Sequence, residues 1–222
     1  MKDIMSKFLV IIFLLILFSC SISNSQVISS CGIKGGMVFA KHTFDYSINY
    51  SFITQYRPGI DIGIYTELFS QPILSGLAEI HYIQKGYKVK VAVTTEQNPE
   101  GNGQYITLTP RVDYLSVPVL LKVREEYKWI NPYLYVGPHF DIKLAHSDDY
   151  GASNFKELHT LDIGATFGAG IQFKLAKKLG ILLEGRFNQP ITSSVSNSFI
   201  KVKNYSFEIL TGINFNLLKN KK

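Results

Sequence analysis

The chain has 222 residues, enough for one β-rich domain, and carries a formal net charge of +6. Its lysines are scattered along the sequence, so the basic excess does not indicate a nucleic-acid partner. Of its two cysteines, one lies within the first 25 residues, which leaves Cys31 without a partner for an internal disulfide.

Residues 1–25 have the features of a cleaved signal peptide. Lys2 and Lys7 give a basic start, and the apolar run 8–18 is shorter than the roughly twenty residues that a membrane-spanning helix needs. A small-x-small pattern ends at Ser25 and predicts cleavage between Ser25 and Gln26. We therefore expect one mature domain, residues 26–222.

A lipoprotein is the alternative interpretation of the same leader. Residues 17–20 (Leu-Phe-Ser-Cys) resemble a lipobox, in which Cys20 would be acylated after cleavage. The bulky Phe18 and the second cleavage pattern downstream favour the ordinary signal peptide.

Eight segments alternate apolar with polar residues, the pattern that predicts β-strands. The first is rich in glycine, which leaves its register open, whereas Leu161 to Lys174 places every apolar side chain at an odd position. The parity of the apolar residues changes near Gly86 and near Tyr114, where we expect β-bulges. In chain order, the predicted strands lie at about 32–41, 60–65, 78–82, 114–123, 133–142, 161–174, 181–188 and 205–217.

The connections between these strands are of two kinds, which take turns along the chain. The long polar connections cover roughly 43–57, 94–104, 143–158 and 188–203, and the short ones cover roughly 70–75, 124–131 and 175–179. Outer-membrane barrels combine long external loops with short periplasmic turns. The sequence therefore predicts an all-β fold, an eight-stranded antiparallel up-and-down transmembrane β-barrel of the outer membrane, with both termini in the periplasm.

A soluble sandwich or lipocalin-like barrel would produce similar strands but would turn its apolar face inward. Three features favour the membrane barrel. Glycines and charged residues lie together on the polar face of the strands. The strands are longer than the usual five or six residues. The sequence is also rich in aromatic residues, with 13 Tyr, 15 Phe and one Trp. Several aromatic residues fall at strand ends, where girdles belong: Tyr127, Trp129, Tyr133, Tyr205 and Phe215.

Four motifs resemble, in the same order, the porin-like outer membrane β-barrel family common in Bacteroidetes. They are Glu79-x-x-Tyr82-x-Gln84-Lys85-Gly86, Tyr114-Leu115-Ser116-Val117-Pro118-Val119-Leu120-Leu121-Lys122, Pro132-Tyr133-Leu134-Tyr135-Val136-Gly137-Pro138 and Asp162-x-Gly164-x-x-x-Gly168-x-Gly170. The resemblance implies an eight-stranded barrel of the OmpA and OmpX type, and it implies fold and location rather than catalysis. Such barrels usually end on an aromatic residue that the barrel assembly machinery reads. Here seven residues follow Phe215.

The inward faces of the predicted strands carry charged residues that a narrow lumen must pair. An eight-stranded barrel is just wide enough to be filled by side chains, and an unpaired charge there costs several kcal/mol. We expect an ion-pair network with Arg186 at its centre, between Glu184, Glu208 and a carboxylate on the opposite wall. Its predicted members are Glu79, His81, Asp162, Glu184, Arg186 and Glu208, with Asp61, Glu67 and Lys122 also facing inward. Such a network predicts a plugged lumen; the alternative is a small gated porin for solutes.

Enzymatic and metal chemistry find little support in the sequence. His81 and Ser116 could be proposed as a lipid-modifying pair, but both are predicted to face inward and no G-x-S-x-G motif is present. The five histidines are dispersed without metal-ligand spacing, and the acidic loop at 146–150 is better explained as solvated surface. We expect no enzymatic activity, no cofactor and no metal.

We expect three kinds of partner. Outer-membrane lipid should surround the apolar face, and the barrel assembly machinery should insert the chain. The loops 43–57 and 143–158 are candidates for an extracellular ligand, because external loops carry recognition and the first is rich in Tyr and Phe. We expect a monomer.

Overall fold

The computed structural model describes residues 28–46, 53–69, 71–94, 103–147, 158–196 and 200–217. The predicted signal peptide, the Ser25/Gln26 cleavage site and Cys20 lie outside these residues, as do parts of the loops 43–57 and 143–158. No helix among the described residues is both long enough and apolar enough to cross a membrane.

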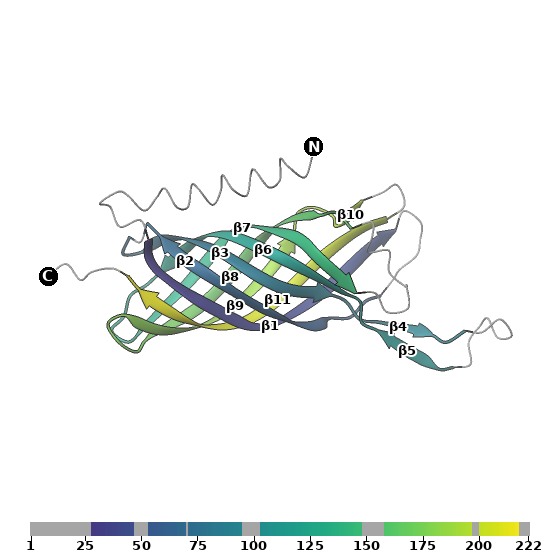
Figure 1. Ribbon diagram of the computed structural model, residues 1–222, viewed down its shortest axis with the longest axis horizontal. Helices are drawn as coiled ribbons and strands as arrows, with labels where there is room; N and C mark the ends of the chain where they lie inside the picture. Colours follow the sequence, from purple (N-terminus) through teal and green to yellow (C-terminus); the bar gives the residue numbers. More distant parts are fainter. Residues whose placement is uncertain are drawn as a thin grey trace.

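Antiparallel strands form one closed sheet (Figure 1). Its order is β1-β2-β3-β6-β7-β8-β9-β11, and β11 pairs back onto β1 from Ser30↔Asn216 to Tyr46↔Ile200. This pairing confirms the predicted eight-stranded up-and-down barrel. The barrel strands are β1 Ile28–Tyr46, β2 Arg57–Leu68, β3 Leu74–Gly86, β6 Arg111–Arg124, β7 Ile130–Ser147, β8 Leu161–Lys174, β9 Leu179–Pro190 and β11 Ile200–Asn216.

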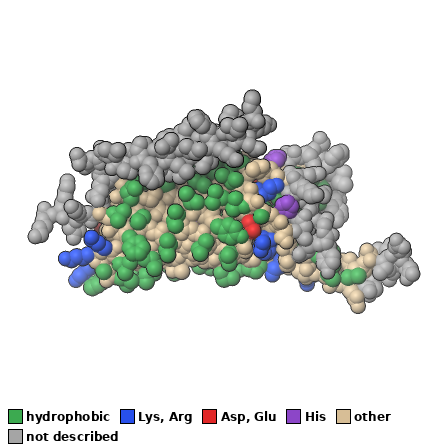
Figure 2. Space-filling view, in the orientation of Figure 1, with side chains coloured by type: hydrophobic (Ala, Val, Ile, Leu, Met, Phe, Trp, Pro, Cys, Tyr) green, Lys and Arg blue, Asp and Glu red, His purple; other side chains and the backbone are tan. Residues whose placement is uncertain are grey.

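The apolar face of the barrel points outward and the polar face points inward. On β8, Phe167 is 50% exposed whereas its neighbour Thr166 is fully buried. The same holds around the wall, where Leu134 on β7 and Ile62 on β2 are exposed. Hydrophobic side chains cover the middle of the visible wall, and Lys and Arg side chains gather toward its two ends (Figure 2). This arrangement fits lipid outside and a polar lumen inside, so the soluble barrel is excluded.

The short connections lie together at one end of the barrel, the end at which β1 begins and β11 finishes (Figure 1). They are residues 69–73, 125–129 and 175–178. By the usual orientation of outer-membrane barrels, this is the periplasmic end. At the opposite end β4 Val89–Ala92 and β5 Tyr105–Leu108 form a two-stranded ribbon that projects beyond the rim, and β10 Val195–Ser196 pairs with β11.

The two expected bulges have different outcomes. The register between β6 and β7 shifts between Asp113 and Tyr114, which confirms the bulge there. The prediction of a bulge near Gly86 is wrong, because the register between β3 and β6 shows no shift up to the last pair, Gly86↔Arg111. Gly86 instead ends β3 with a φ of 144°, a backbone angle that favours glycine, and the parity changes because the chain leaves the barrel for the ribbon.

The aromatic residues predicted to form girdles are not all placed at the outer surface. Tyr127 and Trp129 are half or more exposed at the periplasmic rim, as predicted. Tyr133 was assigned wrongly: it is 4% exposed and faces the lumen. Its position near the start of β7 suggested a girdle, but the parity of that strand turns its side chain inward.

Candidate functional site in the barrel lumen

Glycines on the inner face make room for rings that cross the lumen. A Cβ added at Gly168 would overlap the Tyr135 ring, and one at Gly170 would meet the Tyr133 ring. Each pair consists of direct neighbours on β7 and β8. The glycine-spaced face of β8 is therefore the surface against which the β7 tyrosines lie, and these tyrosines then reach the charged centre of the barrel.

Arg186 on β9 contacts three carboxylates from three strands. Its Nη1 lies 2.9 Å from Glu79 Oε2, its Nη2 lies 3.0 Å from Glu184 Oε2, and its Nε lies 3.5 Å from Glu208 Oε2. Arg186 and these carboxylates are at most 3% exposed. The structure thus places the predicted hub between Glu184, Glu208 and a carboxylate on the opposite wall, Glu79.

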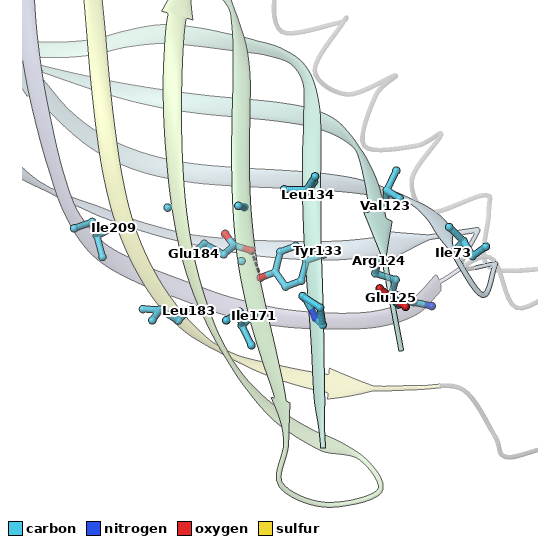
Figure 3. A pocket seen from close by; sticks show the side chains of 14 residues that line it. Ile73, Val123, Arg124, Glu125, Tyr133, Leu134, Ile171, Leu183, Glu184 and Ile209 are labelled. Carbon is cyan, nitrogen blue, oxygen red and sulfur yellow. Dashed lines mark hydrogen bonds between the residues drawn. The ribbon is translucent and has the colours of Figure 1, made fainter. Parts of the chain in front are cut away.

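A second cation, Lys34 of β1, contacts the same carboxylates. Its Nζ donates to Glu79 Oε1 at 2.7 Å and to Glu184 Oε1 at 2.8 Å. The Tyr133 hydroxyl donates to Glu184 Oε1 at 2.7 Å, and Figure 3 shows the ring and the carboxylate pointing toward each other. Glu184 therefore accepts from a lysine, an arginine and a tyrosine, which offsets the cost of burying its charge.

His81 extends the network toward β2. Its Nδ1 lies 2.6 Å from Asp61 Oδ1, and its Nε2 lies 3.0 Å from Glu79 Oε2. Ser116 is its register neighbour on β6, and the Ser116 hydroxyl is hydrogen-bonded to Asp141. Because both ring nitrogens face carboxylates, this His–Ser pair lacks the contact that would activate the serine as a nucleophile.

Separate ion pairs lie on either side of this central layer. Toward the periplasm, Glu67 is paired with Arg124 and lies 3.1 Å from Lys122 Nζ. Toward the outside, Lys85 Nζ lies 2.6 Å from Asp141 Oδ2.

Asp162 is buried in the lumen but is not brought into the network with the other five predicted residues. It accepts from Ser194 Oγ at 2.6 Å and from the Tyr114 hydroxyl at 3.4 Å. Ser194 belongs to the connection after β9, so Asp162 ties a loop segment to the barrel wall. Period-two alternation predicts which face a residue occupies but not its height along the barrel, and for this reason the sequence does not separate Asp162 from the central residues.

An apolar layer fills the extracellular end of the lumen. Inward-facing residues of the barrel strands form a cluster there with residues of the long connections, which include Val89 and Leu108 of the ribbon and Val195 of β10. The cluster comprises Val38, Ala40, Ile83, Tyr87, Val89, Leu108, Val112, Tyr114, Leu158, Val195 and Val202. The lumen is thus packed by ion pairs at its centre and by apolar side chains at its outer mouth.

Several residues of the lumen were missed at the level of sequence. Lys34 lies in the glycine-rich first strand, where no register could be assigned, and Lys85 lies at the parity change near Gly86. Lys34 could be identified only from its pairing with Gly212 of β11, where the first and last strands meet. Predicting that pair requires the register between the two strands to be known. Within the residues that the structure describes, no group of three His, Cys, Asp or Glu side chains is arranged to hold a metal ion.

Comparison with known families decides the class of protein. Residues 24–196 match the model of the outer membrane protein beta-barrel domain. The chain belongs to this family. It is an integral β-barrel protein of the outer membrane, in agreement with the closed sheet and the apolar outer wall. No curated protein matches the chain in sequence.

The chain is similar to solved structures of outer-membrane barrels at low sequence identity. OprG of Pseudomonas aeruginosa matches with a TM-score of 0.54 and 10% identity over 86% of this chain and 97% of that one. Neisserial surface protein A matches with a TM-score of 0.47 and 14% identity over 84% and 97%. The outer membrane protease OmpT of Escherichia coli matches with a TM-score of 0.45 and 8% identity over 89% and 99%. The likeness to OprG concerns the fold alone.

Proposed function

We propose that this protein is a closed barrel that anchors an extracellular binding surface in the outer membrane, and that it does not conduct solutes. The observation that carries the proposal is the central layer of the lumen, where Lys34, Glu79 and Glu184 join three different strands across the barrel. A pore would need a continuous water path through this layer. The buried contacts among these side chains, in a barrel just wide enough to be filled by side chains, support the absence of such a path.

The first prediction concerns the ionic conductance of the barrel. Purified protein in a planar lipid bilayer should give no steady conductance, because the ion pairs and the apolar layer above them fill the lumen. An open porin inserted into the same membrane provides the positive control. A reproducible ohmic conductance from the folded barrel would contradict the closed lumen and would favour the gated-porin alternative.

The binding surface is supported by the ribbon of β4 and β5. It projects beyond the barrel end (Figure 1), and within the described residues these two strands pair only with each other. Tyr105 is 68% exposed and Ile106 is 41% exposed on β5. Exposed aromatic and aliphatic side chains beside an unpaired strand edge favour contact with another polypeptide. The loops 43–57 and 143–158 are proposed to contribute to the same surface.

Removing most of the connection between β4 and β5, or the exposed side chains of β5, should reduce adhesion. Cells that display the barrel with residues 93–104 replaced by Asn-Gly, or with Tyr105→Ser and Ile106→Ser, should attach less to surfaces coated with collagen, fibronectin or laminin. Leu175→Ser is the matched control, because Leu175 is 58% exposed at the opposite end. Adhesion that is above background and equal in all variants would contradict a role for the ribbon.

We also infer that the barrel has no catalytic role. This is supported by His81, whose ring nitrogens both contact carboxylates, and by the burial of Ser116 inside the lumen. Hydrolysis of phospholipid, lipid A or peptide substrates by the purified barrel, lost on His81→Gln, would overturn this inference.

A further inference from the structure

A groove of about 900 Å³ crosses the outer wall of the barrel near its periplasmic end. Most of the side chains that line it face outward and are apolar, and Figure 3 shows the lining residues on successive strands. Leu134, Ile171, Leu183 and Ile209 are each 40–64% exposed. These four residues face away from the lumen network, whereas Arg124, Tyr133 and Glu184, which also line the groove, belong to it. The groove therefore lies on the outer side of the wall whose inner side carries the ion pairs.

The register of the strands explains the shape of the groove. Ala169 pairs with Gly185, and Gly185 pairs with Ile209, so a row with two small residues forms the floor. A Cβ added at Gly185 would meet no atom within 4 Å, which means that the floor is open toward the outside.

Two rows of larger side chains flank this floor. Phe167 pairs with Phe187 and Phe187 pairs with Phe207, which forms an aromatic ridge on the extracellular side. Ile171 pairs with Leu183 and forms an aliphatic ridge on the periplasmic side. The two ridges are four residues apart along β8, or about 13 Å between backbones. After both rows of side chains are subtracted, the space between them has roughly the width of one hydrocarbon chain.

The periplasmic end of the groove meets a rim of mixed charge, in which the cations Arg124, Lys128 and Lys174 lie beside Glu125 and Glu126. Ile73, Arg124 and Glu125 line this end, and they lie in or beside the short connections between strands. Two further cations lie there: Lys174 at the end of β8 donates from Nζ to the Tyr127 carbonyl, and Lys128 of the 125–129 turn has its Nζ 5.5 Å from the Trp129 ring centroid. Exposed lysines and aromatic rings at a membrane rim are suited to phosphate-bearing headgroups.

We propose that this groove binds one acyl chain of a phospholipid of the periplasmic leaflet, with its phosphate among the lysines of the adjacent turns. The position of the groove determines the occupant. It opens at the end that carries the short turns and the strand termini, where the outer membrane presents phospholipid, and the cations of the rim complement a phosphate. A second copy of the chain would bury apolar surface equally well but would bring the cations of two rims together.

Photoactivatable phospholipid tests the proposal. The full barrel is reconstituted in vesicles of phosphatidylethanolamine and phosphatidylglycerol that contain a trace of phospholipid with a diazirine on one acyl chain, and crosslinked residues are mapped by mass spectrometry. We expect labelling to concentrate on the aliphatic ridge at Ile171 and Leu183. Gly185→Phe fills the floor and should reduce this labelling at least about fivefold. Val119→Phe places the same phenyl ring at a 46% exposed outward position that does not line the groove, and it should leave the labelling unchanged.

Each other outcome overturns a defined part of the proposal. Equal labelling around the whole wall, or equal labelling in Gly185→Phe, would show that the groove holds no particular lipid. Loss of the label on addition of lipid A would assign the groove to the other leaflet, and protein–protein crosslinks at Leu183 would assign it to a second copy. A diazirine-bearing diacylglycerol that labels as strongly as the phospholipid would remove the role of the phosphate. Heat-modifiable mobility checks folding, and Ala169→Leu tests the same floor if Gly185→Phe does not fold.

Discussion

Replacing Arg186 with Met should lower the free energy of unfolding by about 3–5 kcal/mol, because removal of one partner leaves buried charge uncompensated. Arg186 contacts Glu79, Glu184 and Glu208, and its side chain is 2% exposed. Lys34 still reaches two of these carboxylates, but Glu208 loses its guanidinium contact. Urea unfolding in lipid vesicles, followed by the fluorescence of the single Trp129 and by heat-modifiable mobility, measures the change.

Two variants show whether the effect is electrostatic. Arg111→Met removes an arginine whose side chain is 40% exposed beside Asp113, and it should cost less than about 1 kcal/mol. Adding Glu79→Gln to Arg186→Met should recover part of the lost stability, because one fewer carboxylate is left without the guanidinium. If Arg186→Met and Arg111→Met are equally stable, the central ion pairs do not hold the barrel together.

The sequence was informative about this network where alternation was regular. Arg186 and Glu184 lie in a strand with clear parity, so their inward direction and their pairing could be predicted. Lys34 could not be found in the same way, because its strand contains Gly32, Gly35 and Gly36 and lacks a regular apolar face. Its partners become apparent only when β1 pairs with β11, which is a contact between the first and the last strand of the barrel.

The fold could be predicted more completely than the extracellular end. Strand number, antiparallel order and the outward apolar face all follow from period-two alternation and from the lengths of the connections. The ribbon of β4 and β5 could not be separated from a loop, because alternation in a short segment does not indicate where a strand leaves the membrane. For the same reason the alternation predicts a bulge near Gly86, whereas Gly86 marks the point where the chain leaves the barrel.

The glycines of β8 lead to a prediction about packing. Gly168→Ala should destabilise the barrel by about 1–3 kcal/mol, which is the usual cost of overpacking. The added methyl would overlap the Tyr135 ring, and the ring is held in place by its neighbours, with the Arg186 guanidinium 5.5 Å from its centroid. Urea unfolding in vesicles measures the difference.

A double-mutant cycle separates this clash from the general effect of replacing glycine in a strand. In a Tyr135→Leu background the methyl has space, so Gly168→Ala should there cost close to nothing. Gly185→Ala is the matched control on the neighbouring strand, since its methyl points into open space outside the barrel, and it should change stability by less than about 0.5 kcal/mol. A cost at Gly168 that persists after Tyr135 is removed would mean that glycine is needed there for its backbone. In that case the tyrosines would not depend on the glycine face of β8 to reach the charged centre of the lumen.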